Sequence, residues 1–263
     1  MRFKSMSCAM TGIVRLAPEI LAMMVMVMAV SPLHAGDVSP QDQYKKCMEM
    51  IEHDAEKAFD QAIEWRDLGG GAPSEHCIAA ALLALEYYTE AAGRLEELAQ
   101  QPTDDLGLRL GLLRQAAQGW SLAEKPERAY AALTAALQLD GKNPKLLIER
   151  AVVQADMGLY DKAVDDLSVC LSLDPLSADA YTFRASAYRY LDRLDLAVAD
   201  VDHALTLEPD HLEARLERGI VRRLQGDDAG ARQDWVHILE IASGAEVSQL
   251  ARRNLELLDI KAE

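Results

Sequence analysis

The sequence is poor in aromatic residues and in basic charge, and each shortage excludes a class of protein. Aromatic residues fill 5% of the 263 positions. The three tryptophans, Trp65, Trp120 and Trp235, occupy positions suited to packing rather than to stacking on bases or sugars. Lys and Arg number 27 against 43 Asp and Glu, a formal net charge of −16. Because nucleic-acid binding needs a basic surface that neutralises phosphates, nucleic acid is not an expected partner.

Motifs that carry catalysis or hold cofactors are also missing. The sequence has no serine-centred nucleophile elbow, no glycine-rich phosphate loop and no pair of histidines spaced to bind a metal from one helix. The run Gly69-Gly70-Gly71 has no Lys-Ser/Thr after it, so we interpret it as a loop between two helix pairs. We therefore predict a protein without enzymatic activity, cofactor or bound metal.

What the sequence does contain is a period of 34 residues. Three successive windows, 144–177, 178–211 and 212–245, repeat an alanine at the twentieth position and a turn residue at the fifteenth. These residues are Ala163, Ala197 and Ala231, and Gly158, Asp192 and Gly226. A period of 34 is the length of a helix-turn-helix unit, which cannot bury its apolar face alone and must stack on copies of itself.

The same period extends toward the N-terminus with decreasing clarity. Residues 107–109 interrupt it, and the earlier windows are 110–143, 73–106 and a degenerate 39–72. We assign 36–109 to degenerate N-terminal repeats, 110–245 to four regular repeats and 246–263 to a C-terminal capping helix. A solenoid needs such a helix with one polar face. The alternative is that this helix contributes to a dimer, although a monomer is favoured.

The segments Ala151 to Pro175 and Ala185 to Pro209 resemble the tetratricopeptide repeat family. Their small, turn, small and proline positions fall as that family's pattern requires, and the resemblance covers about 39–245. The aromatic residue often seen at the fourth position appears only as Tyr181, and the early windows lack the closing proline. The resemblance implies an all-α, right-handed superhelical solenoid that binds a protein or peptide in its concave groove.

The first 35 residues predict export. Basic residues precede an apolar run of 11 residues, Ile20 to Val30, and Ala35 lies just before Gly36. This pattern is typical of a secretory signal peptide cleaved after Ala35, which leaves no membrane insertion. The run is shorter than the ~20 residues that a membrane-spanning helix needs, which favours a cleaved signal. A signal that is retained as a membrane anchor is the alternative. The chain also looks like repeat proteins of Gram-negative bacteria, which indicates a periplasmic location. Translation from Met6 or Met10 instead of Met1 is left open.

Export gives the cysteines a meaning. In an oxidising compartment Cys47 and Cys77 are expected to form a disulfide that joins the degenerate first repeat to the second. The alternative is a metal site that also uses His53 and His76, but these spacings match no standard ligand motif. Cys170 replaces a small residue of the repeat and is expected to be a buried, inert thiol.

Two rows of charged residues recur with the period and are interpreted as structural pairs. Arginine fills the seventh position of three windows and aspartate the twenty-third, so that the expected pairs are Arg150 with Asp166, Arg184 with Asp200, and Arg218 with Asp234. Both charges are absent together from window 110–143, where Ala116 and Ala132 stand, and from 73–106, where Ala79 and Leu95 stand. Joint presence and joint absence indicate that each arginine binds its own aspartate with two bonds.

The resemblance also implies which side chains face the groove. These are Arg114, Gln118, Ile148, Val152, Thr182, Arg189, Tyr190, Leu216, Ile220 and Arg223. The apolar members are spaced to hold side chains of a peptide, and the arginines favour an acidic or C-terminal carboxylate. Alternatively, the terminal helix covers some of the apolar members. We predict a scaffold of the bacterial envelope that binds its partner in the groove. The other reading is a regulatory subunit of an envelope enzyme or assembly machine that acts through the convex face.

Overall fold

The computed structural model describes residues 39–242, 244 and 246–262, with side chains to residue 260. The predicted signal peptide, residues 1–35, lies outside this part of the chain. All regular structure within the described residues is α-helical, which confirms the prediction of an all-helical solenoid. None of the described helices is both long enough and apolar enough to cross a membrane.

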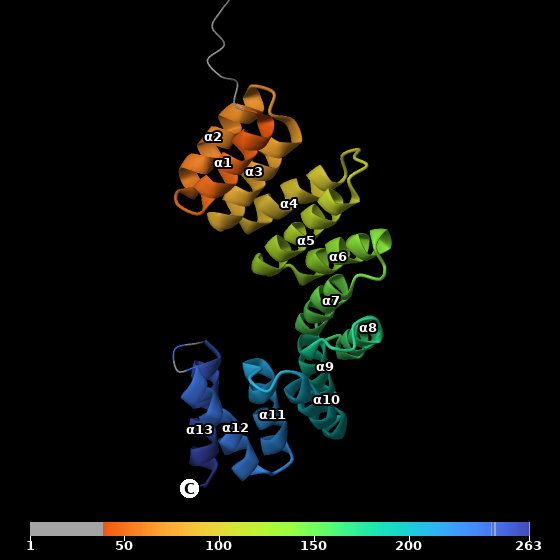
Figure 1. The fold of residues 1–263 in the computed structure, drawn as a ribbon, viewed down its shortest axis with the longest axis vertical. Helices are drawn as coiled ribbons and strands as arrows, with labels where there is room; N and C mark the ends of the chain where they lie inside the picture. The colour runs from red at the N-terminus through yellow and green to blue at the C-terminus, as the bar shows by residue number, and fades with distance from the viewer. Residues whose placement is uncertain (1–38, 243, 245, 263) are drawn as a thin grey trace, which may run out of the picture. The chain divides into compact units, whose positions relative to one another are not determined.

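The described residues form thirteen helices that follow one another in pairs (Figure 1). Their bounds are α1 Pro40–Ile51, α2 Ala55–Asp67, α3 Gly71–Ala84, α4 Tyr88–Ala99, α5 Leu106–Leu122, α6 Pro126–Leu139, α7 Pro144–Asp156, α8 Tyr160–Leu173, α9 Ala178–Tyr190, α10 Leu194–Leu207, α11 Leu212–Leu224, α12 Asp228–Ile241 and α13 Glu246–Ala262. Each helix packs on the next, and odd-numbered helices also contact one another, as α7 does with α9 and α11 with α13. Side-chain hydrogen bonds connect α3 to α5 through His76 and Gln115, and α5 to α7 through Arg114 and Glu149, so the odd-numbered helices form one wall.

Local sequence signals start the helices where the period predicts. The side chain of Asn143 accepts a hydrogen bond from Leu146 N at 3.3 Å and caps α7, whose first residue is Pro144. Ser177 caps α9 in the same way, with 3.2 Å between its Oγ and Ala180 N. Each cap satisfies one of the free N–H groups of a helix N-terminus.

From the α3–α4 pair onward, the turn inside each helix pair uses a left-handed backbone residue. In the four regular windows it is the fifteenth residue, at φ 56° for Glu124, 73° for Gly158, 58° for Asp192 and 86° for Gly226. The corresponding residue between α3 and α4 is Glu86, with φ 65°. Glu86 is only the fourteenth residue of window 73–106. The repeat formed by α3 and α4 is therefore shifted by one residue toward the N-terminus relative to the window counted from the sequence.

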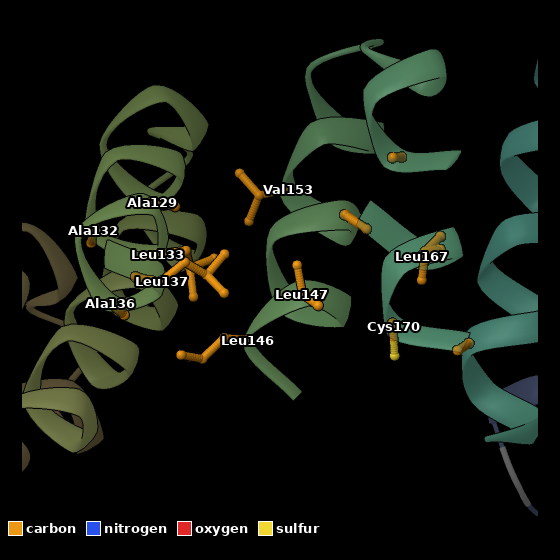
Figure 2. Packing of buried hydrophobic residues seen from close by; sticks show 14 of the residues in the cluster. Ala129, Ala132, Leu133, Ala136, Leu137, Leu146, Leu147, Val153, Leu167 and Cys170 are labelled. Carbon is orange, nitrogen blue, oxygen red and sulfur yellow. The ribbon is translucent and has the colours of Figure 1, made fainter. Parts of the chain in front are cut away.

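Small and large residues meet where the two helices of a pair cross. Ala163, Ala197 and Ala231, each at the twentieth position, are 0 to 1% exposed. Leucines fill the space around these crossings, and Figure 2 shows Leu133 and Leu137 of α6 facing α7. Cys170 of α8 is buried in the same cluster as a free thiol. Close approach of the backbones at the small residues lets the surrounding leucines exclude water.

The N-terminal end is held by a covalent link. Cys47 of α1 and Cys77 of α3 form a disulfide with a Cα–Cα distance of 6.3 Å, and both are buried beside Ala58 and Ile78. Disulfides join α-carbons about 4.4 to 6.8 Å apart, so the bridge fits the observed packing. His76, one of the two histidines considered for a metal site, hydrogen-bonds Tyr44 at 2.7 Å and Gln115 at 3.0 Å. The described residues contain no cluster of metal-binding side chains.

The C-terminal end is closed by α13. Its Val247, Ala251 and Leu258 are buried against Trp235 and Ile238 of α12. An ion pair between Arg232 and Asp259 joins the same two helices at the surface. Helix α13 therefore occupies the place that the first helix of a seventh repeat would take.

Candidate functional site

A hollow of about 470 Å³ lies along the wall of odd-numbered helices, between α5, α7 and α9. Four residues of the predicted groove, Arg114, Gln118, Ile148 and Val152, line it. The other residues that line it are Gly111, Gln115, Ala117, Ser121, Leu133, Glu149, Val153 and Phe183. We call this site the α5–α7–α9 hollow. Its volume falls within the ~300 to 1,000 Å³ of typical ligand pockets.

The surface of the hollow is mainly apolar. Leu133 and Val153 are buried at its floor, being 2% and 5% exposed. Val152 and Phe183 stand at its edge and are 36% and 40% exposed. Because an exposed apolar edge above a buried apolar floor favours burial of another apolar group, the hollow can hold a side chain of a bound peptide.

One wall of the hollow carries an ion pair that the sequence analysis missed. The Arg114 guanidinium on α5 donates to Glu149 of α7, with Nε–Oε1 3.0 Å, Nε–Oε2 2.9 Å and Nη2–Oε1 2.6 Å. The hydrogen bonds from Glu149 raise the pKa of Arg114 above its ordinary value. Arg114 is therefore already neutralised, which contradicts the expectation that it is free to bind a carboxylate of the partner.

A second groove arginine is neutralised in the same manner. Arg189 of α9 donates to Glu217 of α11, with Nε–Oε1 2.5 Å. Burial raises the pKa of the Glu217 carboxyl, and the hydrogen bond from Arg189 acts in the opposite direction. Both pairs connect successive odd-numbered helices, so they stabilise the wall that these helices form. Two of the three groove arginines that were expected to favour acidic peptides are therefore already paired.

The remaining predicted groove residues lie outside the α5–α7–α9 hollow. Thr182 is buried, 6% exposed, and its hydroxyl donates to Ala178 O at 2.9 Å, so the expectation that it contacts a partner is wrong. Tyr190 is 57% exposed and stacks on Tyr160 at 4.5 Å between ring centroids. The reason for the difference is local: a short threonine side chain turns back to its own helix, whereas a tyrosine reaches past its neighbours.

At the C-terminal end, apolar groove residues are shared with the capping helix. Leu216 and Ile220 of α11 are partly buried against the cluster formed by Trp235 and Val247. This is the covering by the terminal helix that the sequence left open as an alternative. Arg223 is partly buried, and its Nε has no hydrogen-bond partner among the described residues. The apolar groove residues that α13 does not cover are thus Ile148 and Val152, which line the α5–α7–α9 hollow.

The structure brings together each of the three predicted Arg–Asp pairs with two short bonds. Arg150 contacts Asp166 at 2.7 and 2.7 Å, and Arg184 contacts Asp200 at 2.7 and 2.8 Å. Arg218 contacts Asp234 at 2.9 and 2.6 Å. Each pair joins the first helix of a repeat to the second, and the aspartates are only 1 to 8% exposed.

The arginines also reach the preceding repeat, which the sequence analysis did not anticipate. Nη1 of Arg184 donates to Ser168 Oγ of α8 at 3.2 Å. The equivalent bonds run from Arg150 to Thr134 at 3.4 Å and from Arg218 to Asp202 at 3.1 Å. Each guanidinium therefore links three helices. A polar residue recurring 16 positions before each arginine was the available signal.

The earlier repeats are built without these pairs. Ala116 and Ala132 occupy the equivalent positions on α5 and α6 and are 0% and 3% exposed. Because the α3–α4 pair starts one residue earlier than expected, its equivalent positions are Ile78 and Arg94 rather than Ala79 and Leu95. Ile78 is fully buried, and Arg94 pairs with Glu90 at 2.9 Å and with Glu75 at 3.4 Å.

Two residues of the hollow, Glu149 and Phe183, are functional candidates that the sequence analysis missed. Both occupy the sixth position of their windows, which was not among the positions expected to face the groove. The sixth position lies beside the fifth and ninth on a helix and faces the preceding odd-numbered helix. Comparing that position between windows, where Gln115, Glu149 and Phe183 succeed one another, would have revealed the row.

Comparisons with known proteins agree with this architecture. The family profile described as Tetratricopeptide repeat matches residues 178–211. Tetratricopeptide repeat protein 36 of Homo sapiens is 31% identical over 141 residues, 52% of this chain and 71% of that protein. Its Bos taurus counterpart is 33% identical over 119 residues, 44% of this chain and 61% of that protein. RNA polymerase II-associated protein 3 of Xenopus laevis is 32% identical over 102 residues, 38% of this chain and 16% of that protein.

Solved structures share the fold at lower identity. MamA, residues 41 to the end, from Desulfovibrio magneticus RS-1 has a TM-score of 0.57 and 19% identity, covering 66% of this chain and 97% of the other. YrrB, described as a tetratricopeptide repeat protein with an unusual peptide-binding site, has a TM-score of 0.55 and 19% identity over 67% of this chain and 90% of the other. This chain belongs to the tetratricopeptide repeat family, whose members generally mediate protein–protein interactions.

Proposed function

We propose that this protein is a non-enzymatic adaptor that binds an extended or helical peptide segment of a partner protein in the α5–α7–α9 hollow. The observation that carries the proposal is an apolar hollow that three successive odd-numbered helices line and that contains four of the predicted groove residues. Its apolar floor and its exposed edge at Val152 and Phe183 support an apolar anchor residue in the ligand. The description of YrrB as a peptide-binding protein is consistent with this use of the fold.

The polar residues of the hollow support recognition of the peptide main chain. Gln118 and Ser121 are exposed at the hollow. An amide side chain presents both a donor and an acceptor, so Gln118 matches the N–H and C=O groups of an extended ligand. Arg114 and Glu149 neutralise each other, so the proposed ligand segment has an apolar anchor and no required acidic terminus.

We further propose that the mature protein works in the periplasm of a Gram-negative bacterium. The N-terminal pattern of residues 1–35 and the pairing of Cys47 with Cys77 support export, because structural disulfides persist in oxidising compartments. N-terminal sequencing of the protein recovered from a periplasmic fraction should begin at Gly36. A protein that stays in the cytosol with residues 1–35 attached would contradict this location.

A displayed library of random peptides tests the binding site. We expect enriched peptides to share an apolar anchor, and their affinity for Val152→Glu to fall at least about tenfold, equivalent to about 1.4 kcal/mol, in fluorescence polarisation. Val169→Glu is the matched control, because Val169 is also an exposed valine, 47% against 36%, but lies on even-numbered α8.

Three results separate the alternatives. Loss of binding in Val152→Glu with retention in Val169→Glu supports the hollow. The reverse result would contradict it and would favour the convex-face alternative. Equal affinity of both variants and the wild type would place the peptide elsewhere and also contradict the proposal.

A further inference from the structure

A second hollow, of about 450 Å³, lies on the N-terminal side of the α5–α7–α9 hollow. Tyr44 of α1, Pro73 and His76 of α3, Leu98 of α4 and Leu108 of α5 are among the residues that line it. We call it the α1–α3–α5 hollow. Both hollows are lined mainly by three successive odd-numbered helices and by one buried leucine of an even-numbered helix. The two sites therefore have the same construction, and they share α5.

The buried polar group of the α1–α3–α5 hollow is already hydrogen-bonded within the protein. His76 is 8% exposed, and its Nε2 donates to Gln115 Oε1 at 3.0 Å. Because an amide oxygen only accepts, Nε2 carries the proton of the neutral ring, and Nδ1 accepts from the Tyr44 hydroxyl at 2.7 Å. Both ring nitrogens are thus used, so His76 offers no polar partner to a ligand.

The remaining surface of this hollow favours an apolar occupant. Leu98 is buried, 5% exposed, whereas Leu108 is 41% exposed and open to a ligand. The Asp105 carboxylate, which also lines the hollow, caps α5 by accepting from Leu108 N at 2.9 Å. Since a polar group would lose hydration here without gaining a buried partner, an apolar side chain fits the hollow best.

The two hollows open on one face of α5. Leu108 lines the α1–α3–α5 hollow, and Gly111, Gln115 and Gln118 line the α5–α7–α9 hollow. Their successive separations of three, four and three residues place them on the same side of a helix. The hydrogen bond from His76 to Gln115 joins the two linings directly. A ligand that lies along this face of α5 can therefore reach both hollows.

The separation of the hollows determines the spacing of the groups that fill them. Helix α3 is the middle helix of the first hollow and α7 of the second, two steps apart along the wall. Neighbouring packed helices lie about 8 to 10 Å apart, so two steps cover roughly 20 Å. An extended chain advances about 3.3 Å per residue and crosses this distance in about six residues. A helical ligand would need about 13 residues.

The polar side chains between the hollows favour the extended form. Gln115 uses its Oε1 for His76, so its amide N–H groups can donate to a main-chain carbonyl of the ligand. Gln118 is exposed and presents both a donor and an acceptor. Because the main-chain groups of a helix are already bonded to one another, these amides match an extended chain better.

We propose that the two hollows bind one extended peptide segment of the partner, with an apolar side chain in each hollow and about six residues between the two anchors. The inference rests on the proposed function, because it continues the ligand of the α5–α7–α9 hollow into a second site. The ligand class is then a segment with two spaced apolar residues, and Leu108 determines specificity for one of them.

The spacing of apolar residues in selected peptides tests the proposal. A displayed library of random peptides of about 16 residues is long enough to include the helical spacing as well. Selection on the wild-type protein should enrich sequences with two apolar positions about five to seven residues apart. Enrichment of a single apolar position, or of two positions about 13 residues apart, would overturn the extended ligand with two anchors.

A substitution in the protein, combined with one in the peptide, separates the two hollows. Leu108→Glu should weaken an enriched two-anchor peptide at least about tenfold in fluorescence polarisation. Of the two derived peptides in which serine replaces one anchor, one should bind Leu108→Glu and the wild type equally. Leu106→Glu is the matched control, because Leu106 is also an exposed leucine at the start of α5, 46% against 41%, but is not among the residues that line either hollow.

The outcomes distinguish this inference from the proposed function. If Val152→Glu weakens the two-anchor peptide and Leu108→Glu does not, the second hollow is overturned and the proposed function stands. Weakening by Leu108→Glu alone would contradict the proposed function, and it would also overturn the two-hollow ligand because one hollow then suffices. Equal weakening by Leu106→Glu and Leu108→Glu would overturn the second hollow, since added charge alone would explain the effect.

Discussion

Residues 144–245 and residues 110–143 stabilise the same helix crossing by opposite means. In the three later repeats the crossing contains a partly buried arginine held by two bonds to a buried aspartate, as in Arg184 and Asp200. In the earlier repeat the same positions hold Ala116 and Ala132, both buried. Since both arrangements occur in one fold, the ion pairs are one solution to packing and are not required for forming the helix pair.

The difference teaches what the charges do. Close packing of two alanines stabilises a crossing through burial of apolar surface, whereas a buried ion pair recovers little net energy after desolvation. A guanidinium that contacts three helices, as Arg184 does with Asp200 and Ser168, restricts how neighbouring repeats slide past one another. The row of Arg150, Arg184 and Arg218 is therefore interpreted as fixing the register between neighbouring repeats. The α5–α7–α9 hollow remains the candidate site for a partner.

The largest effect is expected at the last pair of the row. Asp234 is 1% exposed and accepts bonds from Arg218 at 2.6 Å and from Arg222 at 2.9 Å, with Arg215 at 3.7 Å. Asp234→Ala should cost at least about 3 to 5 kcal/mol, because it leaves several arginines without their shared partner. Urea unfolding measures the change. Asp202→Ala is the control, since that carboxylate is 51% exposed, and an equal loss in both variants would contradict the interpretation.

The repeats that lack the row are expected to depend on the disulfide instead. Replacing Cys47 and Cys77 together by alanine should lower the free energy of unfolding by about 3 to 4 kcal/mol on the chain-entropy account of a closed loop of this size. Thermal unfolding with and without a reducing agent checks this. The reducing agent should affect only the wild type. A variant as stable as the wild type would show that the N-terminal end needs no staple.

A smaller effect is expected at Gly219, which distinguishes the last repeat from its neighbours. The eighth position holds Ala151 and Ala185 in the two previous windows, but a Cβ at Gly219 would lie 2.7 Å from Trp235 Cε2. Gly219→Ala should therefore cost about 1 to 3 kcal/mol through overpacking. Adding Trp235→Leu, the residue type found at the equivalent Leu167, should make the alanine tolerable. A neutral Gly219→Ala change in thermal unfolding would contradict this pairing of small with large residues.

The smallest expected effect is a pH dependence at the N-terminal end. Burial lowers the pKa of His76, which faces Tyr44 and Gln115, so the folded protein holds a neutral imidazole. Its stabilising contribution is complete above the unfolded pKa of about 6.5 and is lost as the pH falls from there toward the folded pKa. The melting temperature of the wild type should fall more between pH 7.5 and 5.5 than that of His76→Gln. Parallel curves for the two proteins would contradict the assignment.

Much of the fold could be predicted from the sequence because packing repeats with the chain. Alanines at the twentieth position and turn residues at the fifteenth mark helix crossings directly, so α6 to α12 follow the four regular windows, whereas α5 begins at Leu106 and includes residues 107–109. The same comparison identified the Arg–Asp pairs, since each partner recurs at a fixed separation of 16. Near residues 107–109 the predicted repeat register was wrong by one residue. An insertion there shifts the register, and only the left-handed turn at Glu86 shows by how much.

The candidate site was less predictable for a physical reason. Exposure of a groove residue depends on neighbouring repeats, which a comparison of single positions does not include. Arg114 and Arg189 were expected to be free because their partners, Glu149 and Glu217, belong to the following repeat and to another position. Phe183 was missed for the same reason. Contacts within a repeat are visible in the period, whereas contacts between repeats require pairs of positions to be considered together.

A double-mutant cycle at Arg184 and Asp200 tests most directly the claim that the charged row is structural and replaceable. The double change to alanine copies the Ala116 and Ala132 arrangement of the earlier repeat. We predict that each single change costs about 3 to 5 kcal/mol in urea unfolding and that the double change costs at least about 2 kcal/mol less than the sum. Losses that add within about 0.5 kcal/mol would contradict the pairing on which this account rests.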